Sequence, residues 1–148
     1  MADKSVQVAN DGLGLPYSLE AEQSVLGAVL VEPDSINRVA DVLKVEYFYL
    51  PEHQAIFGVM LDKMIRNLRI DFVTVLESLK ADGYFSTEDG KAYLLKLANM
   101  VPFLANLENY AKIVREKYEA RCLIQAAKEI TQEAMDPSTE QDMIRDAA

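Results

Sequence analysis

The side chains in this sequence that could carry out chemistry are few and lie far apart. His53 is the only histidine and Cys122 the only cysteine, so neither a cysteine–histidine metal site nor an internal disulfide can form. His53 lies in the first turn after Pro51 and has no evident partner to orient it as a catalytic base, which favours a structural role. Cys122 lies within an expected helix, where a free cysteine is usually a small packing residue.

Two acidic pairs could in principle act as general acid and base: Glu20 with Glu22, and Glu88 with Asp89. Both pairs are expected near helix starts, where the helix dipole stabilises negative charge. Gly90-Lys91 is followed by alanine and lacks the preceding glycine that a phosphate-binding loop requires. The sequence therefore predicts no catalytic, metal-binding or cofactor-binding residue in this chain.

Composition indicates a globular protein that contacts other proteins. The 148 residues suit one domain with a hydrophobic core, and half of them are hydrophobic. The net charge of −9 provides no basic footprint for nucleic-acid phosphates. No apolar run approaches the length of a membrane span, and the N-terminal residues lack the hydrophobic core of a signal peptide. We therefore expect a cytoplasmic protein that binds neither nucleic acid nor membrane directly.

Hydrophobic residues recur at helical spacing along most of the chain, which predicts an all-α fold. The first helix is expected after Pro16, with Ser18 as its N-terminal cap and Val25 and Leu26 facing inward. About five short helices of this kind would form a compact head. The others are expected to begin at Glu32-Pro33-Asp34, at Pro51, after the cap Asp71 and after Asp89-Gly90, and Gly83 and Pro102 are expected to end two of them.

Two segments are not expected to be helical. Residues 1–15 are polar and contain glycine, which is typical of a flexible arm. Residues 45–49 are aromatic and β-branched, so propensity alone would suggest a short strand. Because no partner strand is evident, we expect this segment to be a connector that packs its rings on the core.

The last helix is expected to be much longer than the others. From a cap at Asn106 to about Met135 the sequence contains neither glycine nor proline, and strong helix formers predominate. About 30 residues at 1.5 Å each give a length of about 45 Å, whereas a head of about 90 residues should be only about 30 Å across. The second half of the helix still carries an apolar side, so we expect a partner to cover it.

A turn is expected at residues 136–139, and Glu140 begins a segment typical of another helix. That segment reaches Ala148 after about two turns without a cap, so we expect a chain cut inside a helical hairpin. The expected organisation is a flexible arm over residues 1–15, a globular helical head over 16–103, and a long helix with a truncated hairpin over 104–148.

Short motifs along nearly the whole folded chain resemble one known family. Each motif alone is weak, but the ordered set at this spacing is specific. In chain order they are Ser18-Leu19-Glu20-Ala21-Glu22-Gln23-Ser24-Val25-Leu26-Gly27, Phe48-Tyr49, Pro51-Glu52-His53, Ile56-Phe57, Asp71 with Thr74, Gly83, Gly90, Tyr93-Leu94, Pro102, Ala105-Asn106, Tyr110-Ala111, Val114-Arg115-Glu116-Lys117 and Leu123-Ile124. From Pro16 to about Met135, the chain resembles the N-terminal domain of DnaB-type replicative DNA helicases.

This resemblance implies a helical head followed by a helical hairpin. In such helicases the hairpins pair, and the domains form a collar, a trimer of dimers, above the hexameric motor ring. The collar docks primase, and helicase-loader proteins act nearby. The motor that hydrolyses ATP lies downstream of this domain, so ATP and magnesium are expected only in the absent motor domain. The chain would then be an N-terminal fragment of such an enzyme.

The expected contact residues lie on the long helix. Tyr110 and Tyr118 mark a surface that could face primase; core packing is the simpler role for Tyr110, whereas the two roles are equally supported for Tyr118. Pairing between subunits is expected through Ile113, Leu123, Ile124, Ala127, Ile130, Met143 and Ile144.

Two alternatives remain open at the level of sequence. A free-standing helical adaptor without a motor fits the composition equally well. An open reading frame that continues past Ala148 into a Gly-Lys-Ser/Thr phosphate loop would decide for the helicase. A small helical enzyme would need a titratable cluster that the sequence does not supply, and nucleotide hydrolysis by the isolated chain would revive that possibility.

Overall fold

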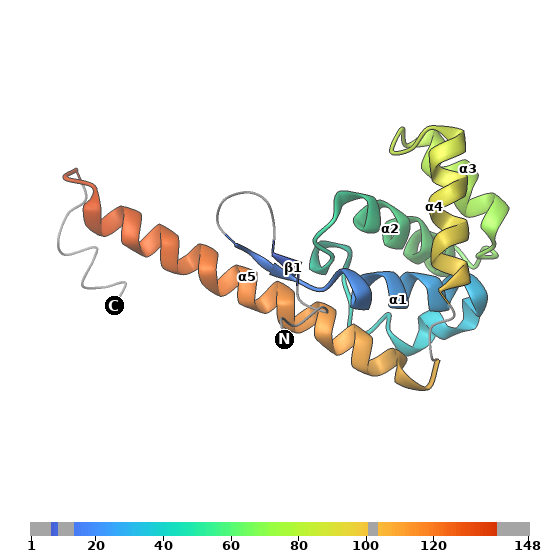
Figure 1. The fold of residues 1–148 in the computed structure, drawn as a ribbon, viewed down its shortest axis with the longest axis horizontal. Coiled ribbons are helices and arrows are strands. Elements are labelled where there is room, and N and C mark those ends of the chain that lie inside the picture. The colour runs from blue at the N-terminus through green and yellow to red at the C-terminus, as the bar shows by residue number, and fades with distance from the viewer. Residues whose placement is uncertain (1–6, 9–13, 101–103, 139–148) are drawn as a thin grey trace.

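Residues 7–8, 14–100 and 104–138 are described in a computed structural model, and most of them are helical (Figure 1). The all-α prediction is confirmed, apart from one short pair of strands. No helix in this described part is both long and apolar enough to cross a membrane. The helices are α1 (Leu19–Val31), η1 (Pro33–Arg38), η2 (Val45–Tyr47), α2 (Pro51–Ile65), α3 (Phe72–Ala81), α4 (Thr87–Asn99), η3 (Leu104–Asn106) and α5 (Leu107–Met135), where η denotes a 3-10 helix.

The two strands are β1 (Gln7–Val8) and β2 (Pro16–Tyr17), which pair antiparallel with Gln7 opposite Tyr17 and Val8 opposite Pro16. Strand β1 lies inside the segment for which the sequence predicts a flexible arm. The pair lies beside the middle of α5, so it covers part of that helix (Figure 1).

Three of the expected helix boundaries depend on residues that act as predicted. The Ser18 hydroxyl accepts a hydrogen bond from the Ala21 N–H at 3.2 Å and caps α1. The Asp71 carboxylate accepts the Thr74 N–H at 2.8 Å and caps α3, and this bond lowers the pKa of Asp71. Gly83 follows the end of α3 with φ of 75°, a conformation that glycine adopts without strain.

The second expected helix is a 3-10 helix, η1, rather than an α-helix. Its proline start agrees with the sequence, but its interior contains serine and asparagine, which compete with the helical backbone for hydrogen bonds. The Asn37 amide donates to the Asp34 carbonyl at 3.1 Å, which is a bond of this kind. The side chains of Ile36, Val39 and Leu43, in and just after this helix, are nevertheless buried.

Helix α4 begins at Thr87, before the Asp89-Gly90 pair that the sequence places ahead of it. The Ser86 hydroxyl caps this earlier start by accepting the Asp89 N–H at 3.2 Å. Gly90 is then inside the helix, where a Cβ atom would lie 3.0 Å from Phe85 and 3.1 Å from Leu76. Close packing of the Phe85 loop and α3 therefore explains the glycine, which is a packing residue here and not a helix boundary.

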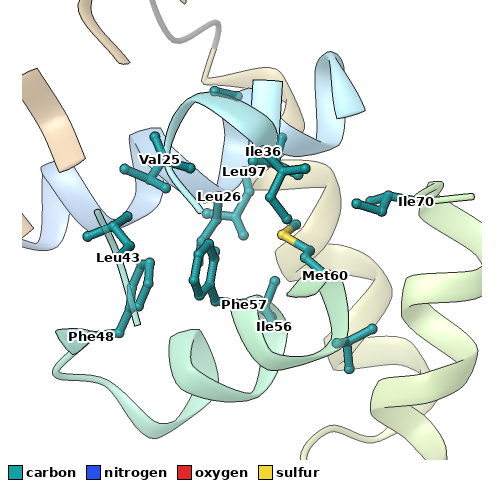
Figure 2. Close-up of a cluster of buried hydrophobic side chains, with 14 of the residues drawn as sticks. Val25, Leu26, Ile36, Leu43, Phe48, Ile56, Phe57, Met60, Ile70 and Leu97 are labelled. Carbon is teal, nitrogen blue, oxygen red and sulfur yellow. The ribbon is translucent and has the colours of Figure 1, made fainter. Parts of the chain in front are cut away.

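The hydrophobic core of the head is built mainly around α1, in which Val25, Leu26 and Val29 have no exposed surface (Figure 2). Helix α2 contributes Ile56, Phe57 and Met60, and the connector before it contributes Phe48, whose ring lies 4.8 Å from that of Phe57. The prediction that residues 45–49 pack their rings on the core is therefore confirmed for Phe48, whereas the expectation of a non-helical connector is wrong, because Val45–Tyr47 form the 3-10 helix η2.

The first half of α5 closes the core from the other side. Leu107, Ala111 and Val114 are buried at helical spacing against α1. The start of α5 is also tied to η1, because the Arg38 guanidinium binds both Glu108 carboxylate oxygens, at 2.7 and 2.6 Å, and the Leu104 carbonyl at 2.7 Å. These bonds hold the pKa of Glu108 down at about 2. The Asn106 side chain makes no capping bond, contrary to the sequence prediction, so the Arg38 bonds and η3 secure this helix start instead.

Candidate protein-interaction surface

Helix α5 divides into a covered half and a free half. Up to Val114 its inward side chains are buried in the core, whereas no described residue from Cys122 onward is buried. Leu123, Ile130 and Met135 have exposed fractions of 72%, 55% and 78%. Figure 1 shows residues 122–135, which we call the free half of α5, extending away from the head. The helix therefore extends beyond the head, as its length predicts.

The free half carries an open, mostly apolar depression of about 390 Å³ on one side. A single helix cannot enclose such a surface, but a second helix laid against it could bury the apolar side chains. The residues that line it are Ile124, Ala127, Lys128, Thr131 and Gln132.

The structure brings four of the predicted pairing residues together on this free half: Leu123, Ile124, Ala127 and Ile130. Ile113 is placed differently, because it is half-buried and packs against the core of its own head. Met143 and Ile144, with the expected second arm of the hairpin, lie outside the described residues.

The two tyrosines predicted to face primase both make contacts within their own chain. Tyr110 is half-buried against the core. Tyr118 stacks on Tyr47 with ring centroids 4.6 Å apart, and its hydroxyl donates to Glu46 at 3.4 Å. The Cys122 side chain beside that hydroxyl raises the pKa of Tyr118 to about 12. Only the remaining exposed edges of these rings are available to another protein.

A buried polar network in the head was not foreseen from the sequence. His53 has no exposed surface, and its Nδ1 lies 2.7 Å from a carboxylate oxygen of Glu22, which is 1% exposed. The other Glu22 oxygen accepts the Tyr49 N–H at 2.8 Å. His53 Nε2 contacts the Tyr93 hydroxyl, which also accepts from the Gln23 amide at 3.2 Å. The partner that the sequence did not reveal for His53 is therefore Glu22, which has a structural role beyond its place in the first turn of α1.

One arrangement of protons satisfies the whole network. A neutral His53 donates from Nδ1 to Glu22, and the Tyr93 O–H donates to Nε2. Burial raises the pKa of Tyr93, so its hydroxyl keeps its proton. Because both nitrogens of His53 are occupied and the ring is sealed from solvent, the network binds α1, α2 and α4 to one another and offers no open position to a substrate.

Helical spacing in the sequence could have identified the buried polar residues of this network. Glu22 shares a face with the buried Val25 and Leu26, and His53 shares one with Ile56 and Phe57. A polar side chain on an inward face must find a buried partner. Arg121 carries the same signal, because it continues the spacing of Val114 and Tyr118 on α5, and its contacts were also missed.

Within the described residues, no group of three or more histidine, cysteine, aspartate or glutamate side chains is arranged to hold a metal ion. The arrangement described here can bind another helix or protein along the free half of α5. Its chemistry is that of apolar association.

Comparisons with known proteins agree with this description. Residues 14–116 match the family model of the DnaB-like helicase N terminal domain. The chain is 41% identical over 133 residues to the replicative DNA helicase DnaB of Geobacillus stearothermophilus, a match that covers 90% of this chain and 29% of that protein. It is 40% identical over 131 residues to the replicative DNA helicase DnaC of Bacillus subtilis (strain 168), covering 88% of this chain and 28% of that protein. The chain thus spans less than a third of these relatives.

A solved structure shares the fold. The crystal structure of the N-terminal domain of DnaB helicase from Mycobacterium tuberculosis superposes with a TM-score of 0.79 at 36% sequence identity. The match covers 88% of this chain and 95% of that one, so most of this chain shares the fold of that domain.

Proposed function

This chain belongs to the family of DnaB-like helicase N-terminal domains, and from that premise we propose that it is the collar domain of a hexameric replicative DNA helicase. In this role it pairs subunits through the free half of α5 and docks primase at the replication fork in the cytoplasm, with a helicase loader acting nearby. It performs no catalysis itself. ATP and magnesium are assigned to a motor domain outside this chain.

The observation that supports subunit pairing is the uncovered apolar side of α5. Leu123 and Ile130 remain largely exposed although the head has a well-packed core of its own. An apolar helix surface of this kind is stable in water when a similar surface packs against it, and a second copy of the chain supplies one. The depression around Ile124 and Ala127 provides room for the side chains of that copy.

Replacing Ile124 and Ile130 together with aspartate should abolish self-association. Each isoleucine loses at least about 1.5 kcal/mol of burial, so the dissociation constant should rise about 100-fold or more. Sedimentation velocity over a range of concentrations measures the change. Far-UV circular dichroism should show that helicity is retained.

The matched control is Gln125→Asp with Ala126→Asp, which adds the same charge at exposed positions outside the apolar depression. This variant should associate like the wild-type chain. Unchanged sedimentation of the Ile124/Ile130 variant, or equal weakening by the control, would contradict pairing through this surface.

Primase docking is tested by mixing the chain with the C-terminal domain of a primase and measuring complex formation by calorimetry. We expect a complex, and we expect it to weaken when Glu46 and Tyr118 are replaced by alanine, because their exposed edges lie where α5 leaves the head. Lys91→Ala on the distant, exposed face of α4 is the control. If no complex forms at high concentration, the proposed primase docking is wrong. That result does not test subunit pairing.

A further inference from the structure

One arginine contacts the head at the point where α5 leaves it. Arg121 follows the covered half of α5 and directly precedes the free half. Its guanidinium donates to the Pro16 carbonyl in β2 and to the Tyr47 carbonyl in η2, each at 2.9 Å. These carbonyls belong to segments 105 and 74 residues earlier in the chain. One side chain thus fastens the helix to two separate parts of the head.

Two tyrosine rings lie near this guanidinium and two more stack on them, and we call the four the tyrosine cradle: Tyr17, Tyr47, Tyr49 and Tyr118. The Arg121 guanidinium carbon lies 5.1 Å from the ring centroid of Tyr49 and 5.8 Å from that of Tyr118. Each of these rings is backed by another, since Tyr17 stacks on Tyr49 at 4.4 Å and Tyr47 on Tyr118 at 4.6 Å. A planar guanidinium can bond in its plane while its faces contact aromatic rings, which a lysine ammonium cannot reproduce.

The buried network of the head supports the cradle from behind. Glu22 accepts the backbone N–H of Tyr49, so the pair of Glu22 and His53 fixes the segment that carries this ring. Burial lowers the pKa of Arg121, and the negative charge of Glu22 opposes that shift. The connection from the core of the head to the free half of α5 is therefore continuous through Tyr49 and Arg121.

Among the described residues, Arg121 is the last side chain along α5 that donates a hydrogen bond to the head. The hydrogen bonds described along the free half, from Gln125 to Glu129 at 3.1 Å and from Thr131 to the Ala127 carbonyl at 2.9 Å, remain within the helix itself. The Arg38–Glu108 bonds secure the opposite end of α5. The direction of the free half is therefore held by the packing of the covered half of α5 on α1 and, where the helix leaves the head, by the contacts of Arg121.

We propose that Arg121 and the tyrosine cradle form a joint that fixes the direction in which the free half of α5 leaves the head. Arg121 is a positioning residue, because it acts through the helix and does not itself lie in the apolar depression. The consequence for assembly rests on the proposed function: in a paired collar, this direction sets how far apart the two heads lie. The joint itself is a property of one chain.

The test measures the direction of the helix within single molecules. Nitroxide labels are placed on cysteines substituted for Val73, which is 66% exposed on the head, and for the exposed Glu133 on the free half, in a Cys122→Ser background. Electron–electron double resonance records the distance between them, after dilution with unlabelled chain. Residue 133 lies 12 residues beyond Arg121, a lever of about 18 Å, so a reorientation of about 20° moves the label by about 6 Å.

We expect one narrow distance distribution in the parent and a shift or broadening of about 6 Å in Arg121→Gln, with unchanged helicity. Arg121→Lys keeps the charge but lacks the planar guanidinium, so a smaller change in the distance distribution is expected. This variant also serves as the test if Arg121→Gln fails to fold. Arg115→Gln is the matched control, because Arg115 is paired with Glu119 on the same helix at 3.6 Å.

Parental distances in either folded Arg121 variant would overturn the joint. An equal change in the Arg115→Gln control would overturn it as well, because the effect would then belong to the helix in general. Since the distance is recorded within one chain, the result does not depend on whether copies pair. The experiment therefore distinguishes a wrong proposal about the joint from a wrong assignment of the collar domain.

Discussion

Replacing His53 with alanine should destabilise the head by about 3 kcal/mol or more, because the substitution removes one of the two hydrogen-bond donors of a buried carboxylate. The Glu22 carboxylate, 1% exposed, would keep its bond from the Tyr49 N–H and lose its bond from the imidazole. The Tyr93 hydroxyl would lose its acceptor at the same time. Urea unfolding followed by circular dichroism at neutral pH measures the loss in the free energy of unfolding.

The reciprocal variant distinguishes a hydrogen-bond network from simple space filling. Glu22→Gln has nearly the same volume, but its amide can accept from only one of two donors, the Tyr49 N–H or His53, and presents its NH₂ to the other. A loss of about 1–3 kcal/mol is expected. Glu20→Gln, an exposed neighbour on the same turn, should change stability by no more than about 0.5 kcal/mol.

Coupling between the two side chains can be measured directly. The double variant Glu22→Ala with His53→Ala should lose less than the sum of the single losses, since the second substitution removes a group already left unpaired. Additive losses would mean that the two residues stabilise the head independently, and a small effect of His53→Ala would exclude the network as a major source of stability.

Two leucines on the same helix should respond very differently to the same substitution. Leu107→Ala should cost about 2–5 kcal/mol, because Leu107 has no exposed surface and its truncation leaves a cavity beside α1. Leu123→Ala should change the unfolding free energy of the monomer by no more than about 0.5 kcal/mol, because 72% of that side chain is already exposed. The contrast follows from tertiary packing alone, since both variants replace leucine with alanine in the same helix.

Denaturant unfolding at a concentration at which the chain is monomeric measures both leucine variants. At higher concentration Leu123→Ala should instead weaken association, if the free half of α5 pairs. Similar losses for the two variants in the monomer would contradict the division of α5 into a covered and a free half.

Association and orientation are separate properties of α5. The apolar side of the free half supplies the surface on which a second copy would pack, and Arg121 with its tyrosines holds that surface at one angle to the head. A variant can therefore alter one property and leave the other intact. The Ile124/Ile130 and Arg121 variants are designed on that basis.

Much of the local structure could be predicted from residues that act within one turn. Ser18, Asp71 and Gly83 mark helix ends through bonds and backbone angles that involve only near neighbours. Where such signals conflicted, the prediction was wrong: η1 is a 3-10 helix, and α4 begins before Gly90, because packing on Phe85 and Leu76 places that glycine inside the helix.

Composition and spacing along the chain were enough to predict the helical class, the length of α5 and the apolar side of its second half, and to show the family motifs. Which polar residues contact each other depends on how the helices pack. Glu22 and His53 are 31 residues apart, and Arg121 and Pro16 are 105 apart, yet each pair is in contact. Such contacts arise when helices pack, since a buried donor or acceptor must find whichever partner the fold places beside it.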